Sequence, residues 1–239
     1  MVAIITDGGT GFGRALALAR AENGTSKVFI IGRREQPLVD TAAKASARNI
    51  MPVVTTHIDL VIVNSGVPGT PPTVVPSSSE TVNTLMKFRN SHWAQPMGQF
   101  SHVLNVNVTG THYTILALLT LLHEAHKRLI VTSSVAGIMT YPVDFAYTFS
   151  TAALMQLVPV WAARLWPYQI WGVRSVGSAW NGVERGSVDA RCIPVTQAGA
   201  EEDLVGMMMW MASIAGGYLN GQTIVLDGRW SKIDIIAAS

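Results

Sequence analysis

Short apolar runs rich in β-branched residues alternate with longer segments of helical periodicity along the whole chain. A strand that helices cover on both faces of a parallel sheet has such a continuous apolar sequence. The alternation therefore predicts an α/β fold with a doubly wound parallel sheet. The expected strands are residues 2–6, 27–31, 60–64, 128–132, 172–176 and 223–226.

The segments between these strands carry signals for helix ends. Asn23-Gly24 is typical of a helix C-terminus, Pro37 of a first helical turn, and Glu201 opens an acidic first turn. We expect helices over residues 13–22, 37–48, 109–127 and 143–166, and a fifth from residue 201. The proline-rich segment 67–79 directly follows an expected strand, so we interpret it as an exposed loop. Residues 1–239 are thus predicted to form a single domain.

The composition bears on the class of partner. Lys and Arg total 17 against 15 for Asp and Glu, and this net charge of +2 gives no reason to expect nucleic acid. No apolar run reaches the ~18–20 residues that a membrane span requires. The first residues lack the pattern of a signal peptide, and Cys192 has no partner for an internal disulfide. We therefore expect a cytoplasmic protein that binds neither nucleic acid nor membrane.

A glycine-rich turn follows the first expected strand. Its sequence, Thr6-Asp7-Gly8-Gly9-Thr10-Gly11-Phe12-Gly13, leads directly into the first expected helix. Glycines let the backbone turn tightly and approach a pyrophosphate, whose charge the helix N-terminus stabilises. A turn needed only for packing would not require glycine at four of six positions. We predict a dinucleotide site in which the cofactor contacts Gly8, Thr10, Gly11, Phe12 and Gly13.

Two arginines follow the second expected strand. In a dinucleotide-binding fold the adenosine ribose lies at this point, where a carboxylate binds a 2′-hydroxyl and arginine favours a 2′-phosphate. Arg33 and Arg34 therefore favour NADP over NAD. The alternative is a solvated basic turn that only ends the strand.

Polar motifs follow the later strands. Asn64-Ser65-Gly66 ends the third expected strand, Asn107 lies at the start of the long helix, and Ser134 follows the fourth strand, with Tyr147 thirteen residues later. In this order and spacing the motifs resemble those of the short-chain dehydrogenase/reductase family, over nearly the whole chain. The segment 218–228 is similar to the family's Thr-Gly-Gln-x4-Asp-Gly-Gly motif. The loop sequences look most like those of fungal members.

The resemblance implies a Rossmann-type fold and hydride transfer between a nicotinamide cofactor and a carbonyl or alcohol. It assigns Tyr147 as general acid or base, Ser134 as the group that positions the substrate oxygen, and Asn107 as support for a proton relay. It also implies that the cofactor contacts Asn64, Ser65, Gly66, Tyr147 and Val183.

Several residues depart from the family pattern. Thr151 replaces the lysine that normally lowers the pKa of the catalytic tyrosine, and we count this position among the catalytic ones. Asp7 and Arg229 each replace a motif glycine, and Trp180-Asn181 replaces the usual Pro-Gly. Together these changes predict weakened or altered chemistry.

Three hypotheses follow. The first is an NADP-dependent reductase, because a neutral tyrosine already carries the proton that carbonyl reduction requires. The second is a non-redox enzyme of this fold, such as an isomerase, dehydratase or cyclase. The third is an inactive subunit that binds a partner. Asp144, one helical turn before Tyr147, is either an alternative acid or base or a residue that complements the helix dipole.

One connection is too short for the family topology. In the strand order 3-2-1-4-5-6-7, the link from strand three to strand four crosses about three strand spacings and carries a helix. Residues 55–58 can extend only about 14 Å. Either residues 50–56 are themselves the crossover and the edge strand is absent, or a segment is missing from the chain.

Only 13% of the residues are charged, against about 25% in a typical soluble domain. A doubly covered sheet explains part of this shortage, and we assign the rest to oligomer surfaces. The resemblance implies that helices 109–127 and 143–166 pair across a two-fold axis in a homodimer or homotetramer. Trp180, beside the expected nicotinamide, favours a bulky apolar small-molecule substrate. His112, His123 and His126 have no acidic or cysteine partner at ligand spacing, so we expect no metal.

Overall fold

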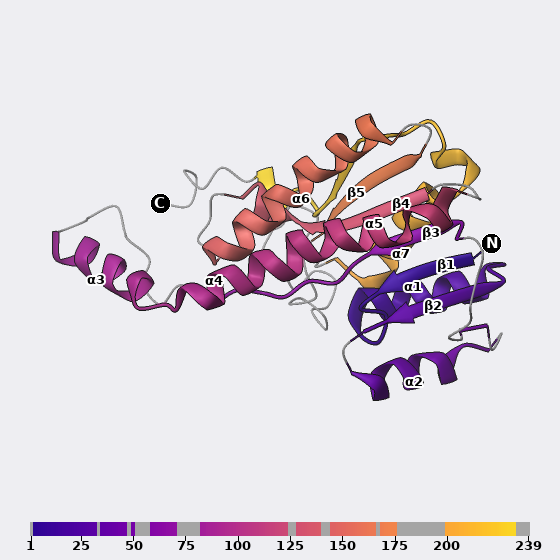
Figure 1. Cartoon of the computed structure of the whole chain (residues 1–239), viewed down its shortest axis with the longest axis horizontal. Helices are drawn as coiled ribbons and strands as arrows, with labels where there is room; N and C mark the ends of the chain where they lie inside the picture. Colours follow the sequence, from indigo (N-terminus) through magenta and orange to yellow (C-terminus); the bar gives the residue numbers. More distant parts are fainter. Residues whose placement is uncertain are drawn as a thin grey trace.

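The structure, a computed structural model, describes residues 2–32, 34–46, 49–50, 58–70, 82–123, 128–139, 144–165, 168–175 and 199–232. A six-stranded sheet with every strand pair parallel forms its centre, in the order β2-β1-β3-β4-β5-β6 (Figure 1). The strands are β1 (Val2–Thr6), β2 (Lys27–Ile31), β3 (Leu60–Val63), β4 (Arg128–Ser134), β5 (Gln169–Ser175) and β6 (Thr223–Leu226). The predicted fold class is confirmed, although β5 begins before the expected residue 172.

Helices cover both faces of the sheet. They are α1 (Gly11–Glu22), α2 (Glu35–Lys44), α3 (Val82–Trp93), α4 (Met97–Leu104), α5 (Gly110–His123), α6 (Phe145–Arg164) and α7 (Glu201–Met211). On one face, Leu16 of α1 and Met208 of α7 pack on alternate strand residues such as Ile5. On the other face, Ile115 of α5 and Val158 of α6 do the same. The alternation of strands and helices along the sequence thus produces two separate cores.

In the described part of the chain, the outer edge of β2 has almost no paired backbone. Ile50 forms a single parallel bridge with Val28, whose backbone N–H donates to the carbonyl of Asn49 at 3.0 Å. No described strand follows this bridge, and residues 51–57 lie outside the described ranges. The next described residues, Ile58 and Asp59, already lead into β3, and the buried Asp59 carboxylate accepts a hydrogen bond from Val2 N–H. Within the described residues, this bridge is the only pairing at the outer edge of β2.

The long helix that precedes β4 differs from the sequence prediction. It begins at Met97 and continues through α4, a π-helical turn (Asn105–Thr109) and α5, whereas the prediction placed its start at residue 109. The residues expected to start the helix are therefore a wide turn inside it. The helix α3 was not predicted: it projects from the body of the molecule (Figure 1), and none of its residues is buried.

Two further observations bear on function. Among the described helices, none is both long and apolar enough to cross a bilayer. Within the described ranges, no three His, Cys, Asp or Glu side chains are grouped so that they could hold a metal ion.

Candidate active site

The predicted site residues gather at the carboxyl edge of the sheet. The hydroxyl of Thr6, at the end of β1, accepts hydrogen bonds from the backbone N–H groups of Asn64 and Ser65, at 2.7 and 2.9 Å. These bonds hold the ends of β1 and β3 together. Adjacent strand ends at a change of chain direction form the usual ligand crevice of an open α/β sheet.

The glycine turn fits a pyrophosphate. A Cβ atom on Gly13 would lie 2.1 Å from the carbonyl oxygen of Asp7, and one on Gly8 would lie 2.5 Å from Ile30, so both glycines are needed for close packing. Gly11 instead has a φ of +53° and open space beside it. Thr10, the N-cap of α1, makes no side-chain capping bond, which leaves first-turn N–H groups of this helix for an anion. The turn therefore has the free donors and the open approach that a dinucleotide requires.

Two of the departures from the family pattern keep a glycine-like backbone. Among the described residues, Asp7 and Arg229 are the only non-glycine residues with positive φ, at 55° and 75°. Both replace a motif glycine. Such a conformation costs of the order of 1–3 kcal/mol for a residue with a side chain. Each of these positions therefore has a backbone conformation that favours glycine.

Of the two arginines predicted to bind a 2′-phosphate, the structure describes Arg34. Arg34 is exposed and is the N-cap residue of α2, where its side chain makes no capping bond. Arg33 and Val183 lie outside the described residues.

The side chain of Asn107 lies at the centre of the site and is 2% exposed. Its Oδ1 accepts from Val67 N–H at 2.8 Å, and its Nδ2 donates to the Val67 carbonyl at 3.1 Å and to Ser150 Oγ at 2.9 Å. Ser150 Oγ in turn donates to the carbonyl of Tyr147 at 2.8 Å. The π turn therefore connects the loop after β3 to the first turns of α6. Gly66 packs beside the same amide, since a Cβ atom there would lie 3.5 Å from Oδ1.

Tyr147 lies in the first turn of α6. Its backbone N–H donates to Asp144 Oδ1 at 2.8 Å, and its half-buried side chain packs against Val67, Val103 and Ala146. Asp144 is therefore the N-cap of this helix, as one of the two sequence interpretations proposed.

Ser134 ends β4 and is buried, with its Oγ accepting from Ala136 N–H at 3.2 Å. The neighbouring Ser133 Oγ donates to the carbonyl of Thr151 at 2.9 Å, which fixes α6 against the end of β4. In the described part of the chain, no hydrogen bond joins Ser134 directly to Tyr147 or Asn107.

The hydroxyl of Thr151 bonds to backbone carbonyls of its own helix. Thr151 is 3% exposed, and its hydroxyl lies 2.9 Å from the carbonyl of Tyr147 and 3.0 Å from that of Thr148. It therefore places no charge near the site. Arg174, which pairs with Ser133 in the sheet, is a cation at this edge, and partial burial lowers its pKa from the ordinary value.

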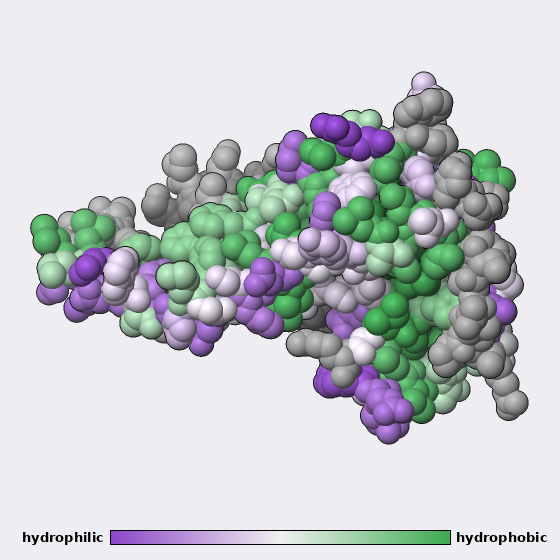
Figure 2. All heavy atoms as spheres, viewed as in Figure 1, coloured by the Kyte–Doolittle hydropathy of each residue, from purple (hydrophilic) through white to green (hydrophobic). Residues whose placement is uncertain are grey.

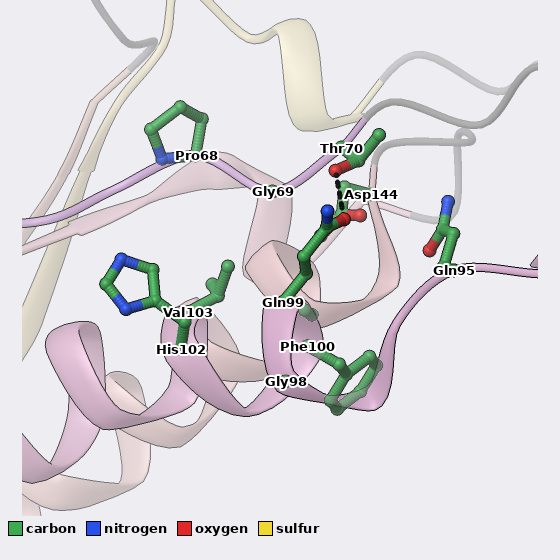
Figure 3. Close-up of a pocket in the computed structure, with 11 residues that line it drawn as sticks. Pro68, Gly69, Thr70, Gln95, Gly98, Gln99, Phe100, His102, Val103 and Asp144 are labelled. Carbon is green, nitrogen blue, oxygen red and sulfur yellow. Dashed lines mark hydrogen bonds between the residues drawn. The ribbon is translucent and has the colours of Figure 1, made fainter.

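A cavity that the sequence analysis missed lies beside Tyr147. Its volume is about 300 Å³, and it is lined by the loop after β3, by α4 and by the start of α6 (Figure 3). Gly69, Gln99 and His102 line it, together with Asp144 and Ala146 on either side of Phe145. A signal for this cavity in the sequence was the position of Gly69 in the loop after a strand. The cavity could not be predicted from it, because α4, which forms another side of the cavity, was not predicted.

Known proteins share the sequence pattern and the fold of this chain. A family model described as short chain dehydrogenase matches residues 1–177. The short-chain dehydrogenase/reductase PhomF of Diaporthe leptostromiformis is 30% identical over 281 aligned residues, covering 100% of this chain and 93% of that protein. The short-chain dehydrogenase/reductase VdtF of Byssochlamys spectabilis is 26% identical over 284 residues, covering 96% and 92%. Both alignments are longer than this chain of 239 residues, in agreement with a shortened segment.

Solved structures show the same fold. The Pseudomonas aeruginosa RhlG/NADP active-site complex matches with a TM-score of 0.73 at 24% identity, covering 96% of each chain. Acetoin dehydrogenase YohF from Salmonella typhimurium matches with a TM-score of 0.78 at 20% identity, covering 98% of this chain and 99% of that one.

Restoring glycine at residue 7 tests the fit of the dinucleotide turn. We expect Asp7→Gly to raise the free energy of unfolding by about 0.5–1 kcal/mol, because relief of the positive φ exceeds the added entropy of the unfolded chain. We also expect it to tighten NADPH binding about fivefold by removing a carboxylate near the phosphates. Thermal unfolding and calorimetric titration measure the two effects.

Asp7→Asn is the matched control, because it removes the charge and keeps a side chain at positive φ. It should tighten NADPH binding without the gain in stability. Unchanged NADPH affinity in both variants would contradict a pyrophosphate position beside residue 7.

Proposed function

The chain belongs to the short-chain dehydrogenase/reductase family, and from this premise we propose that it reduces a carbonyl group of a small molecule with NADPH. The observation that carries the proposal is the fixed position of Tyr147: Asp144 caps its helix turn, and Ser150 links its carbonyl to the buried Asn107. A cofactor of this class supplies a hydride when bound. Proton donation and positioning of the substrate are carried out by side chains of this protein.

Tyr147 donates the proton from its hydroxyl to the carbonyl oxygen of the substrate as the alcohol forms. Ser134, at the end of β4, positions that oxygen by a hydrogen bond. Asn107 holds the loop and the helix that carry the site, and in this way it supports the relay that returns a proton to Tyr147. The turn from Gly8 to Gly13 holds the pyrophosphate, and Asn64, Ser65 and Gly66 border the nicotinamide half.

NADP is the favoured cofactor. The exposed Arg34 precedes α2, beside the end of β2 where a 2′-phosphate would lie, and Arg33 is its neighbour in sequence. A relative of the same fold, RhlG, is described as an NADP complex. These points support NADP, and the single cysteine of the chain supports a cytoplasmic location.

A non-redox enzyme of the same fold is the second candidate. The observation that favours it is Thr151, whose hydroxyl bonds its own helix and leaves the position without charge. An inactive binding subunit would share this feature but would not bind NADPH.

We also propose that the protein forms a homodimer through α5 and α6. These helices lie on the same face of the sheet, and the His112 and Trp161 rings on them are 5.2 Å apart. Large apolar side chains are exposed on both, among them Leu116 at 43% and Phe149 at 54%. Figure 2 shows apolar residues gathered over α4 and the N-terminal half of α6. A two-fold contact would cover this surface.

The redox proposal is tested by following NADPH absorbance with a panel of ketones. We expect turnover by the wild-type protein and a loss of at least 100-fold in Tyr147→Phe, because phenylalanine keeps the ring and lacks the proton donor. NADPH affinity measured by calorimetry serves as the control for folding. Tight NADPH binding without reduction of any ketone would contradict the reductase and favour a non-redox enzyme.

Thr151→Lys separates an impaired reductase from a non-redox enzyme. We expect a gain of at least tenfold in ketone reduction, because a nearby positive charge stabilises the phenolate that Tyr147 becomes. Thr151→Met is the matched control, since it adds a long side chain without charge and should give no gain. Equal rates in wild type and Thr151→Lys would count against the reductase hypothesis.

Sedimentation tests the dimer. The wild-type protein should sediment as a dimer or tetramer, and Leu116→Arg should shift it toward smaller species by placing a charge in the contact. Val39→Arg, on the exposed surface of α2, should leave the sedimentation coefficient unchanged. A monomeric wild-type protein would rule out the proposed interface.

A further inference from the structure

The cavity beside Tyr147 is built around a buried carboxylate. Asp144 is 9% exposed and lines the cavity. Its Oδ1 caps α6 by accepting from Tyr147 N–H, and within the described residues its second oxygen has no hydrogen-bond partner. A carboxylate oxygen without a partner gains most from a donor that carries positive charge.

The loop above this carboxylate leaves no room for a side chain. A Cβ atom on Gly69 would lie 1.7 Å from Asp144 Oδ1 and 2.7 Å from Oδ2. Gly69 is not among the glycines with positive φ, so its backbone conformation does not explain the glycine. The close approach to the carboxylate does explain it, and the loop thus shields Asp144 from solvent on this side.

The other groups around the cavity are neutral amides, a hydroxyl, an imidazole and apolar surfaces. Thr70 Oγ1 lies 3.4 Å from Gln99 Oε1 next to Asp144, and His102 lies across the cavity from them (Figure 3). Phe100 adds an aromatic ring. None of the described lining residues is a lysine or arginine, so Asp144 is the one lining side chain of fixed charge.

We infer that this cavity is a specificity pocket for a protonated amine on the substrate, at the end remote from the reacting carbonyl. The inference rests on the proposed reductase, because Ala146 and Val103, which line the cavity, belong to the apolar cluster against which Tyr147 packs. An ammonium group would donate to the free oxygen of Asp144 and to the amide oxygen of Gln99. A volume of about 300 Å³ holds a small alkylammonium group and lies at the low end of ligand pockets.

The test compares matched substrates. Dimethylamino ketones of graded chain length are assayed beside isosteric ketones in which an isopropyl group replaces the dimethylamino group. At about pH 8, where a free imidazole is neutral, we expect kcat/KM to favour the amine by at least tenfold at the best chain length. In Asp144→Asn this ratio should fall to about one, because asparagine keeps the helix cap and removes the charge. Asp144→Ser, a second capping residue, should behave alike.

Asp203→Asn is the control variant, because Asp203 lies in the first turn of α7 and accepts from Ala200 N–H there. It should keep the wild-type ratio. A wild-type ratio near one, or an unchanged ratio in Asp144→Asn, would overturn the inference.

Binding without turnover separates this pocket from the proposed function. Ligand-observed NMR with benzylammonium and benzyl alcohol should show benzylammonium binding that weakens about tenfold in Asp144→Asn, and weaker binding of the alcohol. If benzylammonium binds in this way but no ketone is reduced, the reductase fails and the pocket stands. If benzylammonium does not bind in preference to benzyl alcohol, the pocket fails whatever the outcome of the ketone assay.

Discussion

The buried amide of Asn107 joins the three segments on which the site depends. It exchanges two hydrogen bonds with the backbone of Val67 after β3, donates a third to Ser150 on α6, and itself lies in the π turn between α4 and α5. Its polar groups are paired with partners from elements far apart in sequence. Loss of any of these bonds would leave buried polar atoms unpaired, at about 1–3 kcal/mol each. The position of Tyr147 relative to the end of the sheet therefore follows from this amide.

The sequence predicts the sheet well because its inner strands are buried on both faces, as in the fully buried Leu60–Val63. The π turn could not be predicted, since Asn107 and Gly110 are residues typical of helix ends and their sequence gives no sign of a wider turn. The helix α3 buries no residue, so tertiary packing leaves no apolar stripe in its sequence. The cavity was missed because it needs α4 to bring Gln99 and His102 beside Asp144, and no helix was predicted there.

At Asp7 and Arg229, which replace two motif glycines, neighbouring residues determine the backbone conformation. The carbonyl of Asp7 is held against Gly13, where no side chain fits. Arg229 N–H and Ser231 N–H both donate to the carboxylate of Asp227, at 2.8 Å each, which fixes the turn at Arg229. Because the neighbours impose positive φ, substitution at residues 7 and 229 strains the backbone locally and leaves the architecture intact. The absence of a motif glycine from the sequence therefore does not mean that the backbone at that position has lost its positive φ.

The N-cap of α6 is the carboxylate Asp144, and the second turn of the helix contains the uncharged hydroxyl of Thr151, with Tyr147 between them. Proton donation by a tyrosine leaves a phenolate, and a negative charge in a partly buried site needs a positive partner. The family supplies that partner with a lysine, and this chain does not. Thr151 has no charge, and the N-cap of the helix is itself a carboxylate, so the charges at the start of α6 disfavour a phenolate at Tyr147. The same charges favour the neutral tyrosine from which carbonyl reduction starts, and the amine proposed to bind at Asp144 contributes to substrate binding, not to the proton transfer.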